Sequence, residues 1–471
     1  MAVKIVVLWT DALTYLLLLT IALFIFWARR YEPLRAPWRE VTRRRLGLVA
    51  LVVLITYGLV ALLDSIHFQS RLSTSPQQGG IYYSTEVKSV LDVLFSPLNE
   101  ISEVTYSAPF ASRLYVKELI ILPNGQTVEA YPRLQYDAVQ QTQPGFNKKT
   151  DILRRILLGI IQGTVLWIII GFPLLVWLAK RRQQTFFNKL GAIFRGKTTV
   201  AWREALLALL IVLQISFVLG HLAAAYHILG TDKVGQDVFY QTIKSIRTGF
   251  LIGTLTTLFM LPLAVILGMV AGYFRGWIDD IIQYLYTTLS SIPGVLLITA
   301  VILSLQIVIA NHPALFPTLA ERADARLLAL CAILGITSWT TLCRLLRGET
   351  LKLHQVEFVE AAVTLGTRPY KILMKHILPN VLHIILITVV LDFSGLVLAE
   401  AVLSYVGVGV DPTTISWGNM INSARLELAR EPTVWWPLLA AFIFMFVLVL
   451  SANVFADAVR DAFDPHLREI N

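Results

Sequence analysis

The chain has 471 residues, of which 56% are hydrophobic and 15% are charged, and its formal net charge at pH 7 is +9. Soluble domains carry about 25% charged residues, so the composition excludes an ordinary soluble protein and indicates a polytopic membrane protein made of apolar helices. The positive charge does not indicate nucleic-acid binding, because the basic residues cluster beside apolar runs, as they do in cytoplasmic loops.

Residues 1–64 contain two apolar runs, at about 6–27 and 46–63. Several arginines follow the first run, and no small-residue cleavage site does, so we expect an uncleaved anchor rather than a signal peptide. The arginines place the end of this first span in the cytoplasm. The N-terminus is therefore predicted to lie outside the membrane, and the second span returns to that side.

Residues 65–150 are polar, with no run of membrane length, and are predicted to form a small α+β domain outside the membrane. Ser84 is expected to cap a short helix that ends at Pro97. Strands are expected at 114–122 and 127–136, joined by a turn at 123–126 that contains Asn124-Gly125. We interpret this domain as a packing or docking module, with a ligand sensor as the alternative.

Residues 151–203 are predicted to form a third span, at about 156–179, followed by a basic cytoplasmic loop. Within this loop, Gly191, Gly196, Lys197 and Thr198 match the phosphate-binding P-loop pattern. A working P-loop follows a buried strand in a nucleotide-binding domain. Here polar and basic residues precede the match and a membrane span follows it, so we interpret the match as chance. A nucleotide-binding membrane enzyme is the alternative.

Residues 204–471 contain six further apolar runs of membrane length. These predicted spans lie at about 205–226, 250–273, 282–309, 327–346, 381–402 and 436–455. Pro262 and Pro293 are expected to kink their helices. The whole chain is thus predicted to be an all-α membrane protein of about nine spans, with a cytoplasmic C-terminus.

Residues 355–365 have the periodicity of a short helix outside the membrane. They lie between the predicted spans at 327–346 and 381–402. One narrow face carries small and aromatic residues, namely Phe358, Ala361, Ala362 and Leu365. Gly366 follows at a position where a left-handed helix stop favours a residue without Cβ. Such a helix is typical of a segment that docks into a groove of a soluble partner. A helix lying on lipid is the alternative.

Two carboxylates fall within the predicted span at 381–402, Asp392 near mid-membrane and Glu400 toward its outer end. A carboxylate in hydrocarbon costs several kcal/mol, so each is expected to face a cavity or a polar partner. Asp392 either lines a substrate pathway and favours cationic groups, or bonds to a polar neighbour on another helix or subunit.

Several of these motifs resemble one family. Glu360-Ala361-Ala362 with Gly366 resembles the EAA loop of ABC-importer permeases. The stretch 227–237 resembles the HPLGTD..GRD signature of dipeptide and oligopeptide permeases, with Gln236 where the family usually has Arg. Its matching residues are His227, Gly230, Thr231, Asp232, Gly235 and Asp237. Residues 347–351, 403–409, 416–418 and 460–465 also resemble motifs of the C-type permease subunit. The resemblance covers about residues 200–467 and leaves an N-terminal extension unexplained.

The resemblance implies a type I ABC importer core of six helices at 204–471, with about three extra N-terminal spans. It implies a peptide permease of the bacterial inner membrane that works by alternating access, and a coupling helix at 355–365 that docks on an ATPase. The implied partners are a second permease, two ATP-binding subunits and a periplasmic substrate-binding protein. ATP and Mg would bind to those partners, so this chain is expected to be neither an enzyme nor a cofactor-binding protein. Glu400 belongs to a family motif.

Locally, Gly230 and Gly235 are expected to allow tight turns in the periplasmic loop, and Thr231 and Asp232 to cap a helix at about 238–248. Two alternatives to peptide import remain. One is a membrane sensor or scaffold built on the periplasmic domain. The other is an importer of another family substrate, namely an antimicrobial peptide, glutathione or nickel. We hypothesise that the extension braces the partner permease or holds the binding protein.

Overall fold

The computed structural model of the chain describes residues 3–28, 32–71, 83–121, 127–138, 147–181, 190–193, 195–196, 198–312, 314, 316 and 318–463. Within them, nine helices are long and apolar enough to cross a membrane, which confirms the predicted number of spans. They are α1 (Trp9–Ala28), α3 (Arg45–Asp64), α7 (Lys148–Arg181), α9 (Trp202–Ala223), α10 (Val238–Phe274), α12 (Gly294–Asn311), α13 (Leu319–Leu353), α16 (Leu378–Tyr405) and α18 (Trp436–Phe463).

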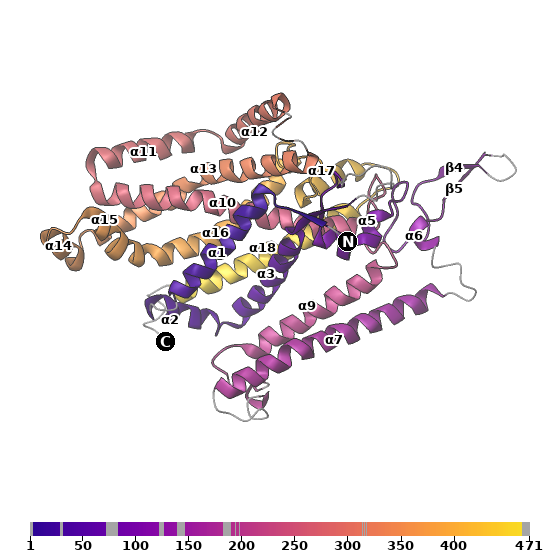
Figure 1. Cartoon of the computed structure of the whole chain (residues 1–471), viewed down its shortest axis with the longest axis horizontal. Coiled ribbons are helices and arrows are strands. Elements are labelled where there is room, and N and C mark those ends of the chain that lie inside the picture. The colour runs from indigo at the N-terminus through magenta and orange to yellow at the C-terminus, as the bar shows by residue number, and fades with distance from the viewer. Residues whose placement is uncertain are drawn as a thin grey trace.

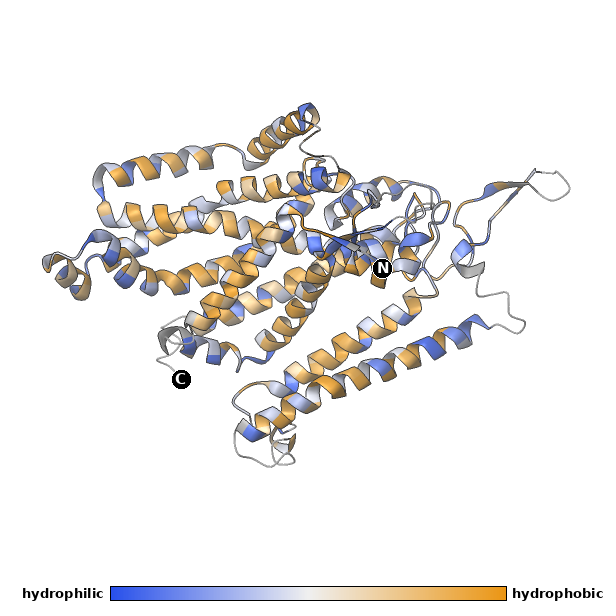
Figure 2. Ribbon diagram, in the orientation of Figure 1, coloured by the Kyte–Doolittle hydropathy of each residue, from blue (hydrophilic) through white to orange (hydrophobic). Residues whose placement is uncertain are grey.

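Hydrophobic residues run along the long helices, while hydrophilic residues gather at their ends and in the connections (Figure 2). Many apolar side chains on these helices are exposed, such as Leu19 on α1 and Ile169 on α7. Water would not tolerate so much apolar surface, whereas bilayer lipid covers it without cost. The protein is therefore a multi-pass membrane protein.

The two longest helices after the extension, α10 and α13, lie against each other along most of their length (Figure 1). Glycines allow this close approach. A Cβ at Gly272 would lie 2.6 Å from the Cβ of Thr350, and a Cβ at Gly335 would lie 2.6 Å from the Cβ of Phe259. Small residues at such contacts are the usual means of bringing membrane helices together. Pro262 lies inside α10, which continues through it.

The prediction of one continuous span at 282–309 is wrong. The structure divides it into α11 (Gly276–Ser291) and α12, with the break at Ile292 and Pro293. Ile292 has ψ of 128°, an extended conformation. Proline disfavours helical geometry in the residue before it and donates no hydrogen bond, so here it ends one helix and starts another.

The domain outside the spans includes a strand from the N-terminus that the sequence did not predict. Strands β1 (Val3–Val6), β2 (His67–Ser70) and β3 (Lys88–Ser89) form an antiparallel sheet in that order. The short helices are α4 (Val90–Leu94), α5 (Ser96–Glu100) and α6 (Gln135–Ala138). The predicted strand pair is confirmed as β4 (Glu118–Ile121) and β5 (Thr127–Ala130), although both strands are shorter than expected and residues 123–126 lie outside the described chain.

The prediction of a helix capped by Ser84 and ended by Pro97 is wrong. Ser89 caps α4, since its hydroxyl accepts a hydrogen bond from the Asp92 N–H at 3.1 Å and its own N–H donates to Asp92 at 2.9 Å. This reciprocal pair satisfies two helix-end donors, which a single hydroxyl at Ser84 would not. Pro97 lies in the first turn of α5, where a missing N–H carries no penalty.

Helices α7 and α9 form a hairpin in which α9 also contacts α3. A Cβ at Gly159 or Gly163 of α7 would lie 2.7 Å or 3.0 Å from backbone Cα atoms of α9. Between these helices, the described part of the P-loop match begins with a helical turn, Gly191 to Ile193, whereas residues 182–189 before it lie outside the described chain. Lys197 lies outside the described residues. Helix α2 (Glu32–Val41) packs on the end of α18, with Trp38 against Phe463.

Candidate functional site

The predicted coupling helix is α14 (Glu357–Thr364), which follows α13 directly. After it come α15 (Pro369–Ile372), a π-helical turn η2 (Leu373–Ile377) and α16. Helices α14 and α15 lie beyond the ends of α10 and α13, at the opposite end of the molecule from β4 and β5 (Figure 1). The segment is therefore helical, outside the spans and attached to two of them.

The two sides of α14 differ in exposure. Val359 and Ala362 are buried in a cluster that includes Ile372 and Ile377. Phe358 is 45% exposed and Leu365 is 84% exposed. Glu360 and Ala361 are also exposed. Of the predicted apolar face, only Ala362 packs inward, and the other three residues are exposed, with the Phe358 ring 6.2 Å from that of His376. The sequence did not single out Val359, which anchors the helix.

Gly366 has φ of +71°, the left-handed conformation that the sequence predicted there. Its N–H donates to the Val363 carbonyl at 2.9 Å, and the Thr367 N–H donates to the Ala362 carbonyl at 3.0 Å. A Cβ at this position would meet no atom within 4 Å. The requirement for glycine therefore comes from backbone conformation and not from crowding.

An ion pair near α14 joins two helices that the sequence did not connect. Arg347 of α13 donates two hydrogen bonds to Asp279 of α11, at 2.5 Å and 2.6 Å. Bidentate pairs of this kind fix the orientation of both side chains. Arg347 stood in a recognised motif, but no local pattern identified Asp279 as its partner. The pair ties α11 to the helix that carries α14.

At the other end of the molecule, residues 227–237 form what we call the signature loop. Gly230 and Gly235 have φ of +70° and +77°, so both turns need glycine, as predicted. The predicted caps are wrong, because Asp237 caps α10 by accepting from the Tyr240 N–H at 2.8 Å. Asp232 instead accepts from the Val234 and Gln236 N–H groups within the loop.

The signature loop holds a buried histidine between two carboxylates. His227 Nδ1 lies 2.6 Å from Asp237, and His227 Nε2 lies 3.7 Å from Glu103 of the extension. Burial disfavours the charged imidazole, but the two carboxylates outweigh it and raise the pKa of His227 to about 9. Burial alone would raise the pKa of Glu103, yet His227 and backbone N–H groups hold it below its usual value. The site is charged at neutral pH.

Residues 103–115 of the extension, which we call the clamp segment, lie directly on the signature loop. Thr231 Oγ1 accepts from the Ser107 N–H at 2.6 Å and donates to the Thr105 carbonyl at 2.8 Å. A Cβ at Gly235 would lie 1.7 Å from the Glu103 carbonyl oxygen, and one at Gly230 would lie 2.3 Å from that of Ser107. The glycines thus serve the clamp contact as well as the turns.

The clamp segment also reaches the connection before α18. Tyr115 packs edge-on against Trp436 with ring centroids 5.0 Å apart, and Arg430 lies 5.1 Å from the Tyr106 ring. The Trp436 indole donates to the Thr231 carbonyl at 3.0 Å. One segment of the extension therefore joins two loops that are about 200 residues apart in the core.

A second buried cluster joins the extension to α10. Arg247 donates to Asp11 of α1 at 2.7 Å. Lys244 pairs with Asp92 of α4, in the domain outside the spans. Asp64 of α3 lies 3.8 Å from Lys244. In this cluster the core supplies the cations and the extension supplies the three carboxylates, all of which are at most 5% exposed.

The two carboxylates of α16 have different surroundings. Glu400 is 1% exposed and accepts from Ser404 at 2.8 Å, and a Cβ at Gly418 of α17 (Trp417–Glu427) would lie 2.8 Å from it. Asp392 is half-buried and has no hydrogen-bond partner within the described residues. Glu400 is therefore buried and hydrogen-bonded inside the protein, whereas the Asp392 carboxylate accepts no hydrogen bond from the described residues.

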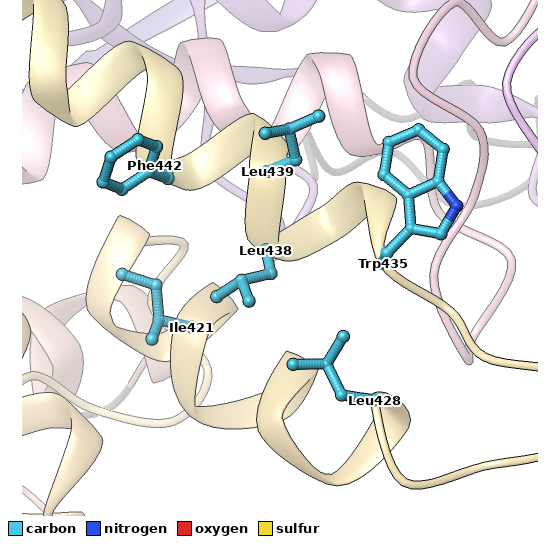
Figure 3. A pocket seen from close by; sticks show the side chains of 6 residues that line it. All are labelled: Ile421, Leu428, Trp435, Leu438, Leu439 and Phe442. Carbon is cyan, nitrogen blue, oxygen red and sulfur yellow. The ribbon is translucent and has the colours of Figure 1, made fainter.

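An apolar pocket lies between α17 and the start of α18 (Figure 3). It has a volume of about 540 Å³ and is lined by Ile421, Leu428, Trp435, Leu438, Leu439 and Phe442. The indole nitrogen is the only side-chain polar atom among these residues, so the pocket suits a hydrocarbon group better than a charged ligand. In the described part of the chain, no group of three or more His, Cys, Asp or Glu residues could hold a metal.

Residues 264–469 match the family described as the binding-protein-dependent transport system inner membrane component. The glutathione transport system permease protein of Pectobacterium atrosepticum is 32% identical over 243 residues, which cover 51% of this chain and 73% of that protein. The oligopeptide and dipeptide permease proteins of Bacillus subtilis are 31% and 30% identical, each over 52% of this chain and over 73% and 70% of their own lengths. All three alignments leave about half of this chain unmatched.

Proposed function

The chain belongs to the family of binding-protein-dependent inner-membrane transport permeases, and from that premise we propose that it carries di- or oligopeptides into the cell. It is a transport subunit rather than an enzyme, and it works with ATPase and substrate-binding partners. The peptide substrate is supported by its relatives, among which are oligopeptide, dipeptide and glutathione permeases.

The observation that carries the mechanism is the divided exposure of α14. Its buried side, with Val359 and Ala362, fixes it to the ends of the spans, while Phe358 and Leu365 are exposed. In our proposal the exposed side docks into a cleft of an ATP-binding subunit. Because α14 is joined to α13 and α16 through short connections, closure of the ATPases would move those spans and switch the cavity between inward-facing and outward-facing states.

We further propose the complete assembly and its orientation. The chain pairs with a second permease, two ATP-binding subunits and one periplasmic binding protein in the bacterial inner membrane. Its N-terminus is periplasmic and its C-terminus cytoplasmic. ATP and Mg bind to the ATPase partners, and this chain holds no cofactor of its own. The basic residues around α2, such as Arg39 and Arg43, support a cytoplasmic position for that end.

Asp392 is proposed to line the pathway. A half-buried carboxylate without a partner in the described chain would favour a cationic group, such as the amino terminus of a peptide. The pathway role of Glu400 stays a prediction, and its closeness to Gly418 of α17 makes a bracing role between α16 and α17 the simpler proposal.

A tagged pull-down in mild detergent from the native cell tests the assembly and the role of α14. Gly366→Val places a β-branched residue at positive φ, a strain of about 1–3 kcal/mol. We expect it to lower ATPase recovery roughly tenfold while keeping the second permease. Gly191→Val is the matched control, because Gly191 has no positive φ and also has open space around it.

Recovery of two ATP-binding subunits and a second permease with the wild-type chain is the expected result. A wild-type chain that recovers no ATPase would contradict the proposed function. Equal ATPase recovery with both glycine variants would leave the function standing and contradict the role of α14.

A further inference from the structure

The signature loop of this protein is covered by its own extension. Thr231 and Asp237 are fully buried and His227 is 2% exposed, all beneath the clamp segment. Only the tip of the loop remains open, where Val234 is 59% exposed. A protein that approaches this end of the transporter therefore meets the extension over most of the loop.

The clamp segment continues into the β4–β5 hairpin, which projects away from the helices (Figure 1). The hairpin is tied to the clamp segment at its base. The Leu114 N–H donates to the Pro132 carbonyl at 2.9 Å, and the backbones of Arg113 and Arg133 form an antiparallel β-bridge. The hairpin is thus anchored to the clamp segment, whose residues 105 and 107 contact the signature loop.

Apolar side chains are exposed along the hairpin. Leu119 is 70% exposed, Tyr131 is 45% exposed and Val128 is 43% exposed. Leu119 pairs with Glu129, and Val128 pairs with Ile120, so Leu119 and Val128 lie on opposite faces. A two-stranded hairpin is marginally stable alone in water, and exposed apolar residues on both faces indicate that a partner covers it.

We propose that the β4–β5 hairpin is the docking site of this subunit for the periplasmic substrate-binding protein, through an apolar contact centred on Leu119. The inference rests on the proposed function, which puts this end of the molecule in the periplasm and supplies the binding protein as a partner. The hairpin lies at the opposite end from α14, so the ATPases do not compete for it (Figure 1). Its continuity with the clamp would join the docked protein to the signature loop.

The test measures the affinity of labelled binding protein for the complete transporter in lipid nanodiscs. Leu119→Asp puts a charge at the centre of the proposed contact and is expected to weaken binding roughly tenfold or more. Val234→Asp is the matched control, since Val234 is also apolar, similarly exposed and located on the open tip of the signature loop. It is expected to leave the affinity within about twofold.

A cysteine crosslink identifies the partner directly. Leu119→Cys, labelled with a benzophenone maleimide, is expected to crosslink to the binding protein, and the native Cys331 and Cys343 are buried. Crosslinking to the second permease, or no crosslink, would overturn the proposal. So would unchanged affinity in Leu119→Asp, or a loss in Val234→Asp alone. Failure of the wild-type transporter to bind the protein at all would instead overturn the proposed function.

Discussion

His227 is a buried histidine that desolvation alone would keep neutral, yet its place between Asp237 and Glu103 keeps it charged. Each carboxylate comes from a different part of the chain, one from the core and one from the extension. The charge of one imidazole therefore contributes to the contact between these two parts.

The stability of this contact should fall in alkaline solution. The pKa of His227 rises from 6.5 to about 9 on folding, so the stabilisation is complete below pH 6.5 and is lost as the pH rises through 9. It amounts to on the order of 3 kcal/mol. The thermal unfolding midpoint in detergent, measured from pH 6 to 10, should decrease over this interval. His227→Gln should have a lower midpoint at pH 6 and a flatter profile, and an unchanged profile would contradict the assignment.

Single residues were predicted well where a local backbone rule applies and poorly where several residues compete. Gly366 follows a helix whose periodicity ends, and it has the expected positive φ. Thr231 and Asp232 are good capping residues, but Asp237 is the cap, because it directly precedes Val238, the first residue of α10. Thr231 is bonded instead to the clamp segment, more than 100 positions away in the chain, and no local signal contains that contact.

At the scale of helices, apolar length was sufficient to predict the nine spans, because a bilayer requires about 20 apolar residues per helix. Pro293 was predicted to kink a helix, but it separates α11 from α12. Proline can kink or end a helix, and only the neighbouring packing decides which. Strand β1 was missed because four residues form a strand only through their pairing with β2, about 60 residues later.

The α7–α9 hairpin should depend on one face of α7. Gly159→Ala would place a Cβ 2.7 Å from the Val218 Cα, a backbone atom that cannot move alone, and should separate the helices at a cost of about 1–3 kcal/mol. Gly171→Ala is the control on the same helix, because its Cβ would meet only Leu206 at 3.9 Å. Hydrogen exchange of α7 and α9 in nanodiscs should increase in the first variant alone. Equal protection in both variants would show that the glycine contact is dispensable.

Across the whole molecule, the extension and the core share one polar interior. Lys244 and Arg247 of α10 have their carboxylate partners on α1, α3 and the domain outside the spans. The sequence suggested a separate domain attached to a family core, because motif resemblance ended near residue 200. It could not reveal that the core carries two partly buried cations whose carboxylate partners lie in the extension, since charge pairing across such distances leaves no periodicity.

The core should therefore not be stable alone. A chain of residues 198–471 removes Asp11, Asp64 and Asp92 from Lys244 and Arg247, and it uncovers the apolar surface that the extension packs against, such as that around Trp436. We expect it to aggregate on extraction, as judged by fluorescence-detected size-exclusion chromatography. Co-expression of residues 1–181 as a second chain should restore a monodisperse peak, because α7 still packs on α9 and the carboxylates return.

A matched variant separates charge from lost packing in this experiment. In the complex with residues 1–181, Lys244→Met with Arg247→Met removes both cations and keeps most of the side-chain volume, so it should broaden the restored peak, because Asp11, Asp64 and Asp92 lose their cations. If residues 198–471 alone gave as sharp a peak and as high an unfolding midpoint as the full chain, the extension would be an accessory and the buried pairs would not support the core. Full recovery by the second chain despite the two methionines would assign the stabilisation to packing, including the contact of the clamp segment with Trp436.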